Sequence, residues 1–156
     1  MQARTKKTLV AMVSDEVHPI HTFIQSWLTS RGFEFKLCGA LQTGKDESWV
    51  TTTVQAAQSV AEGRADTGIF FCWSGTGASM AANKVRGIRA ALSTDVETVR
   101  LARVWNHANV LVLSNRSLTE ELAAAMLDEW FFGAHDLEKG AVGVQELTDL
   151  EDEYMK

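Results

Sequence analysis

A cysteine beside a glycine-rich turn is the part of this chain best suited to chemistry. The apolar run 69–71 ends in Cys72, and residues 73–79 then read Trp-Ser-Gly-Thr-Gly-Ala-Ser. A buried strand that breaks into Gly, Ser and Thr before a helix exposes backbone N–H groups, and such groups bind anions. A thiol beside them adds an acid–base or nucleophilic group. We therefore expect chemistry on a small, oxygen-rich substrate.

Three common uses of such a turn do not fit the residues around Cys72. Met80 occupies the third glycine position of the dinucleotide-binding fingerprint, and no Gly-Lys-Ser/Thr sequence follows that would make a P-loop. A cysteine-based phosphatase loop needs an arginine six residues after the cysteine, where this chain has Ala78. The other cysteine, Cys38, has no comparable turn beside it, and we expect it in the core.

Composition indicates an ordinary enzyme-sized domain. The 156 residues are 46% hydrophobic, so we expect one domain spanning 1–156 with a full core. A net charge of -5 argues against a nucleic-acid or anionic-membrane partner. Two cysteines fit a reducing compartment, and the apolar run 9–13 is too short for a signal peptide or a membrane span. We expect a cytoplasmic protein that needs no cofactor, and no residues have metal-ligand spacing.

Apolar runs alternate with helical patterns along the chain. We expect strands at residues 8–13, 33–37, 68–71, 88–92 and 110–113. We expect helices at residues 20–30, 49–62, 79–84, 94–105, 117–131 and about 142–154, with a loop at 39–48. Thr94 and Glu97 have the spacing of a capping box, and Ser117–Glu120 repeats it. This alternation predicts a Rossmann-like three-layer α/β/α fold with a five-stranded parallel sheet in the order 2-1-3-4-5.

Ligands of such sheets bind at the carboxyl ends of the strands, at the point where the strand order reverses. With the predicted order, that point lies between strands one and three. Asp15, Glu16 and His18 follow strand one, and Cys72 follows strand three. The alternative for Asp15 and Glu16 is that they cap the first helix, and the alternative for His18 and His21 is that they face solvent.

Two segments resemble the ribose-5-phosphate isomerase B and galactose-6-phosphate isomerase family. They are GIFFCWSGTGASMAANKVRGIRAAL at 68–92 and NHANVLVLSNR at 106–116. The match is tight from 68 to 116, looser from 7 to 39 and weak beyond 133. The resemblance implies metal-free interconversion of aldose and ketose phosphates. It also implies a homodimer, or a tetramer, with the active site at the subunit interface and the C-terminal helix docked on the partner subunit.

The same resemblance gives roles to the turn. Cys72 matches the catalytic base, Ser74 matches the residue that handles the substrate hydroxyl proton, and Asp15 matches the first residue of an Asp-His pair after strand one. The N–H groups that hold the enediolate match those of Gly75, Thr76, Gly77 and Ala78.

The chain departs from the family pattern around the substrate. Glu16 replaces the histidine of the Asp-His pair, and Trp73 replaces a glycine of the anion turn, which predicts a smaller pocket. Trp105 stands where many members have the histidine that opens the sugar ring. His107 follows Asn106 where aspartate is usual. Asp15 with either His107 or His18 is then the candidate for ring opening.

The phosphate-binding group is also altered. The family's C-terminal arginines have no counterpart, because no arginine follows Arg116. Arg116 is the candidate within one chain, and Lys139 or His135 are the candidates from a partner subunit.

These observations leave three hypotheses for function. The first is an isomerase of the ribose 5-phosphate/ribulose 5-phosphate type with Cys72 as the base. The second is an isomerase of another sugar phosphate, a tetrulose or a hexose phosphate. The third is a sugar-phosphate-binding module without catalysis.

Overall fold

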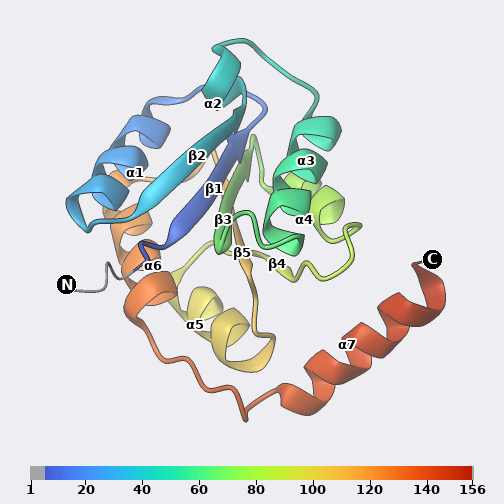
Figure 1. Ribbon diagram of the computed structural model, residues 1–156. Helices are drawn as coiled ribbons and strands as arrows, with labels where there is room; N and C mark the ends of the chain where they lie inside the picture. The colour runs from blue at the N-terminus through green and yellow to red at the C-terminus, as the bar shows by residue number, and fades with distance from the viewer. Residues whose placement is uncertain (1–5, 156) are drawn as a thin grey trace, which may run out of the picture.

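Five parallel strands form a single sheet in the computed structural model, which describes residues 6–155 (Figure 1). Residues 1–5 and 156 of the predicted domain 1–156 lie outside the described residues. The strands are β1 (Leu9–Ser14), β2 (Glu34–Gly39), β3 (Thr67–Cys72), β4 (Ala90–Leu92) and β5 (Val110–Ser114). Helices lie on both faces of the sheet, which confirms the predicted three-layer α/β/α class.

The direction of each crossover determines which face its helix covers. The helices are α1 (Pro19–Ser30), α2 (Ala40–Thr43), α3 (Trp49–Ala61), α4 (Thr76–Ala82), α5 (Val96–Trp105), α6 (Glu120–Phe132) and α7 (Ala141–Tyr154). The crossovers through α3 and α4 run across the sheet in the opposite direction to those through α1 and α5. Because such crossovers are right-handed, α3 and α4 pack together on one face, and α1, α5 and α6 cover the other (Figure 1).

The strand order is β2-β1-β3-β5-β4, so the predicted order 2-1-3-4-5 is wrong for its last two strands. All five residues of β5 are buried, whereas the three residues of β4 are only partly buried. A strand that is apolar on both faces stabilises a sheet most from an inner position. β5 therefore lies between β3 and β4, and its register places Ser114 beside Cys72.

Successive residues of β3 point into the two halves of the core. Ile69 and Phe71 join the cluster beneath α1, α5 and α6, and Phe70 and Cys72 join the cluster beneath α3 and α4. This alternation is the ordinary period of a strand. It places the Cys72 thiol on the α4 side and Phe71 on the α1 side.

Several predicted boundaries shift by a few residues. Helix α4 begins at Thr76, before the predicted residue 79, and α2 lies within the predicted loop 39–48. Asp95 is the N-cap of α5, accepting a hydrogen bond from Thr98 N–H at 2.7 Å, so the capping box predicted at Thr94 is wrong. Thr119, not Ser117, caps α6. No helix in residues 6–155 is long and apolar enough to cross a membrane.

Helix α7 lies apart from the three layers (Figure 1) and none of its residues is buried. The carboxylate of Glu151 accepts the Gly87 N–H at 3.1 Å, and Asp152 pairs with Arg86. A cavity of about 520 Å³ remains between α7 and the β4 edge. Its apolar lining includes Ile88, Ala90, Ala91, Leu147, Leu150 and Tyr154.

Candidate active site

The end of β3 folds back so that backbone N–H groups face the Cys72 thiol. Cys72 is only 6% exposed, and its Sγ accepts a hydrogen bond from Gly75 N–H at 3.1 Å. Gly75 has φ +80, and a Cβ there would lie 2.5 Å from Leu92 Cδ1. Because L side chains rarely adopt this conformation and no space exists for one, glycine is required. The turn thus keeps a hydrogen-bond donor on the sulfur atom.

The start of α4 adds further donors beside the thiol. The first N–H groups of a helix have no intrahelical acceptor, so those of residues 76–78 are available to an anion. Ser74 Oγ lies 2.7 Å from Thr76 Oγ1. Trp49 packs on Gly77, where a Cβ would lie 2.9 Å from the indole ring. Together these residues make the anion turn, defined as residues 72–78, which is walled on one side by tryptophan.

Asp15 directly follows β1, the strand that pairs with β3, and one oxygen of its carboxyl group is buried. Its Oδ1 has no hydrogen-bond partner among the described residues. Burial raises the pKa of this carboxyl above its usual value, and the charges of Glu16 and Asp46 raise it further, against a hydrogen bond within Asp15 itself that lowers it. A buried oxygen without a partner is suited to a substrate hydroxyl group.

Glu16 and His18 form a pair at this edge of the sheet. His18 Nε2 lies 2.9 Å from Glu16 Oε2. The imidazole of His18 lies 5.7 Å from the Trp73 ring, centroid to centroid, so it packs beside the anion turn. His18 is also the N-cap of α1, so the alternative in which Asp15 or Glu16 caps that helix is wrong. The solvent-facing alternative for His18 is wrong too, because the side chain is partly buried.

His21 is a buried polar residue at this edge, so the expectation of a solvent-facing side chain is wrong. It is 1% exposed and bonds to Asn115, which follows β5. Ile24 and Leu28 follow His21 at the spacing of one face of an amphipathic helix. This spacing was the sequence signal that His21 is buried.

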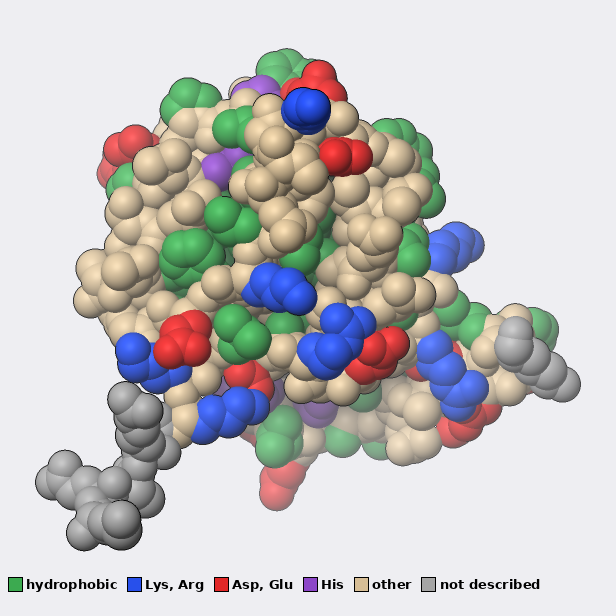
Figure 2. Space-filling model, turned by 45° about the horizontal axis from the view of Figure 1, so that its top comes forward, with side chains coloured by type: hydrophobic (Ala, Val, Ile, Leu, Met, Phe, Trp, Pro, Cys, Tyr) green, Lys and Arg blue, Asp and Glu red, His purple; other side chains and the backbone are tan. Residues whose placement is uncertain are grey.

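Arg116 is the cation that β5 brings to the same edge. Its N–H donates to Trp73 O at 3.0 Å, and its side chain is exposed. Carboxylates outnumber cations at this edge: Asp15 and Glu16 lie beside the loop of Lys45, Asp46 and Glu47, in which Glu47 N–H donates to Asp15 O at 3.0 Å. Figure 2, in which the top of Figure 1 comes forward, shows acidic, basic and histidine side chains gathered there among apolar ones.

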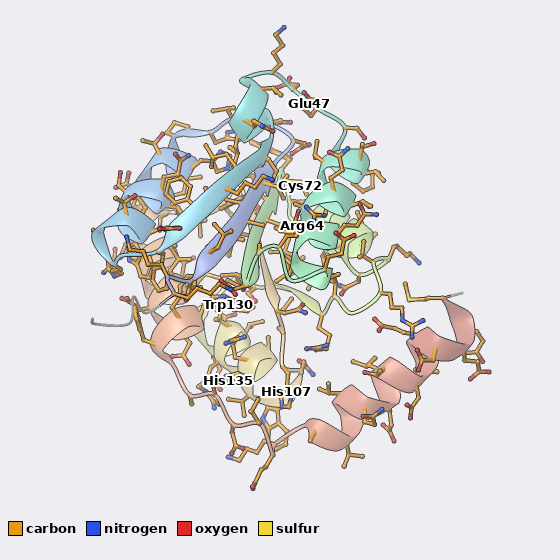
Figure 3. All side chains as sticks on the ribbon, viewed as in Figure 1. Glu47, Arg64, Cys72, His107, Trp130 and His135 are labelled. Carbon is orange, nitrogen blue, oxygen red and sulfur yellow. The ribbon has the colours of Figure 1, made fainter. Side chains whose placement is uncertain are left out.

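Three predicted site residues lie at the opposite end of the molecule. Asn106 and His107 precede β5, whose register places Val110 beside Gly68 and only its far end beside Cys72. His107 Nε2 lies 2.6 Å from Lys139 O, so Lys139 is at this amino edge as well. Figure 3 shows Cys72 and Glu47 at the upper end and His107 and His135 at the lower end. One chain therefore does not bring Asn106, His107 or Lys139 to Cys72.

The residues at the carboxyl edge suit proton transfer beside a carbonyl group. A thiol, a His–Glu pair and a carboxyl surround N–H donors that an oxyanion would accept. No cluster of three or more His, Cys, Asp or Glu side chains within residues 6–155 is arranged to hold a metal ion. The cavity of about 520 Å³ beside α7 is lined mainly by apolar residues and contains none of these groups. The site is therefore identified by the chemistry of its side chains and not by the volume of a cavity.

Comparisons with known proteins identify a family that this chain matches. The family model described as Ribose/Galactose Isomerase matches residues 10–146. D-erythrulose-4-phosphate isomerase 2 of Mycolicibacterium smegmatis is 42% identical over 83 residues, 53% of this chain and 55% of that protein. Ribose-5-phosphate isomerase B of Escherichia coli is 36% identical over 97 residues, 62% of this chain and 65% of that protein.

A solved structure extends the likeness to nearly the whole chain. Ribose-5-phosphate isomerase B of Clostridium thermocellum is similar with a TM-score of 0.87 at 30% identity, covering 94% of this chain and 99% of that one. The sequence matches, by contrast, span only 55% to 65% of the two curated relatives.

The buried carboxyl of Asp15 predicts that Asp15→Asn stabilises the protein at neutral pH. Folding raises the pKa of Asp15, so the ionised form costs stability above that raised value, and the cost vanishes below the ordinary value of 3.8. We expect Tm to rise by about 2 °C at pH 7.5 and to match wild type near pH 3.5, measured by calorimetry.

Asp66→Asn is the control with the opposite sign. The Leu9 N–H and Lys6 hold the pKa of Asp66 low, so this substitution should lower Tm at neutral pH. A fall in Tm for Asp15→Asn at pH 7.5 would contradict the assignment of a destabilising buried carboxylate.

Proposed function

The chain belongs to the ribose/galactose isomerase family, and from that membership we propose that it is an aldose–ketose isomerase of the ribose 5-phosphate/ribulose 5-phosphate type. The observation that carries the proposal is the contact between Cys72 Sγ and Gly75 N–H at the start of α4. It joins a proton-accepting group to donors for the oxygen atom on which charge develops. This pairing is what proton transfer next to a carbonyl group requires.

In the proposed mechanism, the Cys72 thiolate removes the proton from the carbon next to the carbonyl of the open-chain sugar. The electron pair of that C–H bond forms the enediolate double bond, and the carbonyl oxygen becomes the oxyanion that the turn N–H groups bind. Ser74 transfers the hydroxyl proton between the two oxygens, aided by its contact with Thr76. The thiol then returns its proton to the neighbouring carbon, which gives the isomer and restores the thiolate.

Ring opening needs a separate acid–base group, and we assign it to His18 with Asp15. Glu16 accepts from Nε2 of His18, which leaves Nδ1 as the proton acceptor, and the ring already packs beside Trp73. His18 would take the anomeric hydroxyl proton and return it to the ring oxygen, which leaves as an alcohol, while the Asp15 carboxylate accepts a hydrogen bond from a substrate hydroxyl group. His107, the other candidate, lies beside Lys139 at the amino edge, so it reaches this site only from a second copy.

The phosphate group calls for more positive charge than one carboxyl edge provides. Arg116 follows β5 at this edge, where the carboxylates of Asp15, Glu16 and Asp46 also lie. We propose a homodimer, itself able to pair into a tetramer, in which a second copy supplies a cation from its amino edge. Burial and the charges of Arg103 and His107 lower the pKa of His135, so Lys139 is the favoured cation.

Helix α7 supports the same assembly. Four of its apolar residues are 46% to 77% exposed: Val142, Leu147, Leu150 and Tyr154. Leu147, Leu150 and Tyr154 also line the cavity of about 520 Å³ between this helix and the β4 edge. A second copy that covers α7 would bury this surface and bring the partner's Lys139 within reach of the carboxyl edge.

A four-carbon substrate is the second candidate. The side chain of Trp73 lies within the anion turn, is 54% exposed and packs against His18. It narrows the space that a longer sugar would use. Two of the similar proteins are named for D-erythrulose 4-phosphate, and one for galactose 6-phosphate. A tetrulose phosphate also needs no ring opening, which suits Trp105 at the family's ring-opening position.

Replacement of Cys72 is the first test of this proposal. We expect Cys72→Ala and Cys72→Ser to slow exchange of the proton next to the carbonyl by at least about 1,000-fold while folding is retained, because neither side chain can accept the proton. NMR in D2O would follow exchange with tetrose, pentose and hexose phosphates.

Cys38→Ala serves as the matched control, with wild-type exchange expected. Exchange at the wild-type rate in Cys72→Ala would refute the cysteine base. Wild-type protein that binds these sugar phosphates without exchanging any of them would identify the non-catalytic module instead.

If the protein is a dimer, substitution of Lys139 should affect substrate binding, and substitution of Leu150 should affect assembly. Lys139→Ala should raise KM about tenfold with little change in kcat, because it removes binding that is equal in the ground state and the transition state. Leu150→Glu should give a monomer on sedimentation with little activity. Lys7→Ala, which removes an exposed lysine at a distant ion pair, is the control. A fully active monomer, or an unchanged KM in Lys139→Ala, would mean that Arg116 holds the phosphate within one subunit.

A further inference from the structure

His21 is a buried polar side chain whose position the hydrophobic core does not require. It lies in the first turn of α1, is 1% exposed and packs edge-on against Phe71 with 4.6 Å between ring centroids. The neighbouring core residues of this helix, Ile24 and Leu28, are apolar. A leucine would fill the same space, so the hydrogen bonds of the imidazole need their own explanation.

Both nitrogens of His21 are engaged. His18 N–H donates to Nδ1 at 3.1 Å, so Nδ1 carries no proton. Nε2–H therefore donates to Asn115 Oδ1 at 2.8 Å. Burial lowers the pKa of His21 to about 4, which keeps the ring neutral in this tautomer at physiological pH. The side chain is thus fixed as one donor and one acceptor, without capacity for proton transfer.

Asn115 extends this contact to the other loops at the carboxyl edge. Its Nδ2 donates to Ser14 Oγ at 3.2 Å, and Ser14 Oγ also accepts Glu16 N–H at 3.3 Å. Its backbone N–H donates to Cys72 O at 3.0 Å. The loops that follow β1, β3 and β5 are therefore joined through a single buried chain of hydrogen bonds. Its members, named here the His21 bridge, are Ser14, His18, His21 and Asn115.

We propose that His21 is a positioning residue that holds the Glu16–His18 pair and Arg116 at fixed places relative to Cys72. Its role in turnover rests on the proposed function, whereas its role in ordering the loops does not. Loss of the His21 side chain would leave the His18 N–H and the Asn115 Oδ1 without their partners, and the loop would shift to satisfy them. A shift of about 1 Å in an acid–base group is enough to reduce turnover strongly.

Three substitutions separate the two hydrogen bonds from simple packing. His21→Leu removes both bonds and keeps the volume. His21→Gln keeps a donor that can reach Asn115, and His21→Asn keeps an acceptor near His18 N–H. We expect kcat to fall about 30-fold in His21→Leu and about fivefold in the two polar variants. KM should change less than threefold, because the anion turn itself is intact.

Thr67→Val is the matched control, since it removes two hydrogen bonds at the amino edge, one that Thr67 Oγ1 donates to Asn109 O and one that it accepts from Trp130 Nε1. It should lower Tm as much as His21→Leu and leave kcat unchanged. Hydrogen exchange of the backbone, followed by mass spectrometry, gives a readout that does not need activity. In His21→Leu and in the two polar variants, amides of residues 14–18 and 115–116 should exchange at least tenfold faster, and those of β5 should not.

The outcomes are distinct. If wild type isomerises no sugar phosphate but His21→Leu or the polar variants loosen residues 14–18 and 115–116, the proposed function fails and the positioning role stands. If the His21 variants keep the kcat of the wild type and their amides in residues 14–18 exchange at the wild-type rate, the positioning role is overturned. Should His21→Leu fail to fold, the Gln and Asn variants decide by the same two measurements.

Discussion

The site depends on the left-handed backbone of Gly75, which lets a fully buried strand turn into a helix within three residues. With φ at +80 and a Cβ position only 2.5 Å from Leu92 Cδ1, the turn admits glycine alone. This backbone conformation points the Gly75 N–H at the sulfur of Cys72, with 3.1 Å between the nitrogen and Sγ. Because Leu92 and Leu113 wall this turn, the order of β4 and β5 in the sheet is part of the same constraint. The packing of the sheet and the position of the Cys72 thiol therefore depend on the same contacts.

Parallel strands divide the charged groups of this chain between two ends. The carboxyl edge holds the thiol, the Glu16–His18 pair and several carboxylates, whereas the amino edge holds Lys139 with two histidines. A phosphate at the first edge would meet mainly negative charge from its own subunit. The proposed dimer resolves this conflict by placing the amino edge of one copy near the carboxyl edge of the other. The exposed face of α7 supplies a surface through which the two copies would contact each other.

The sequence was sufficient for features encoded by local pattern. Alternating apolar runs gave the fold class, and the break after Phe71 located the anion turn before any tertiary contact was known. The positions of β4 and β5 were not accessible in this way, because their exchange depends on which strand is buried on both faces. His21 was missed since its partner, Asn115, is 94 residues away. The register of β5 also separates His107 from Cys72 within one chain, and sequence patterns alone do not give this register.

Alkylation of the two cysteines tests the central claim, a reactive thiol in a sugar-phosphate site, most directly. Exposure alone favours Cys38, which is partly exposed, over Cys72, which is buried. Burial, however, raises the pKa of the Cys38 thiol, whereas the Gly75 N–H donates a hydrogen bond to the Cys72 sulfur. Mass spectrometry of iodoacetamide-treated protein should show Cys72 modified first, with ribose 5-phosphate or D-erythrulose 4-phosphate slowing that modification and not that of Cys38. Faster modification of Cys38, or a Cys72 rate that no sugar phosphate changes, would contradict the account.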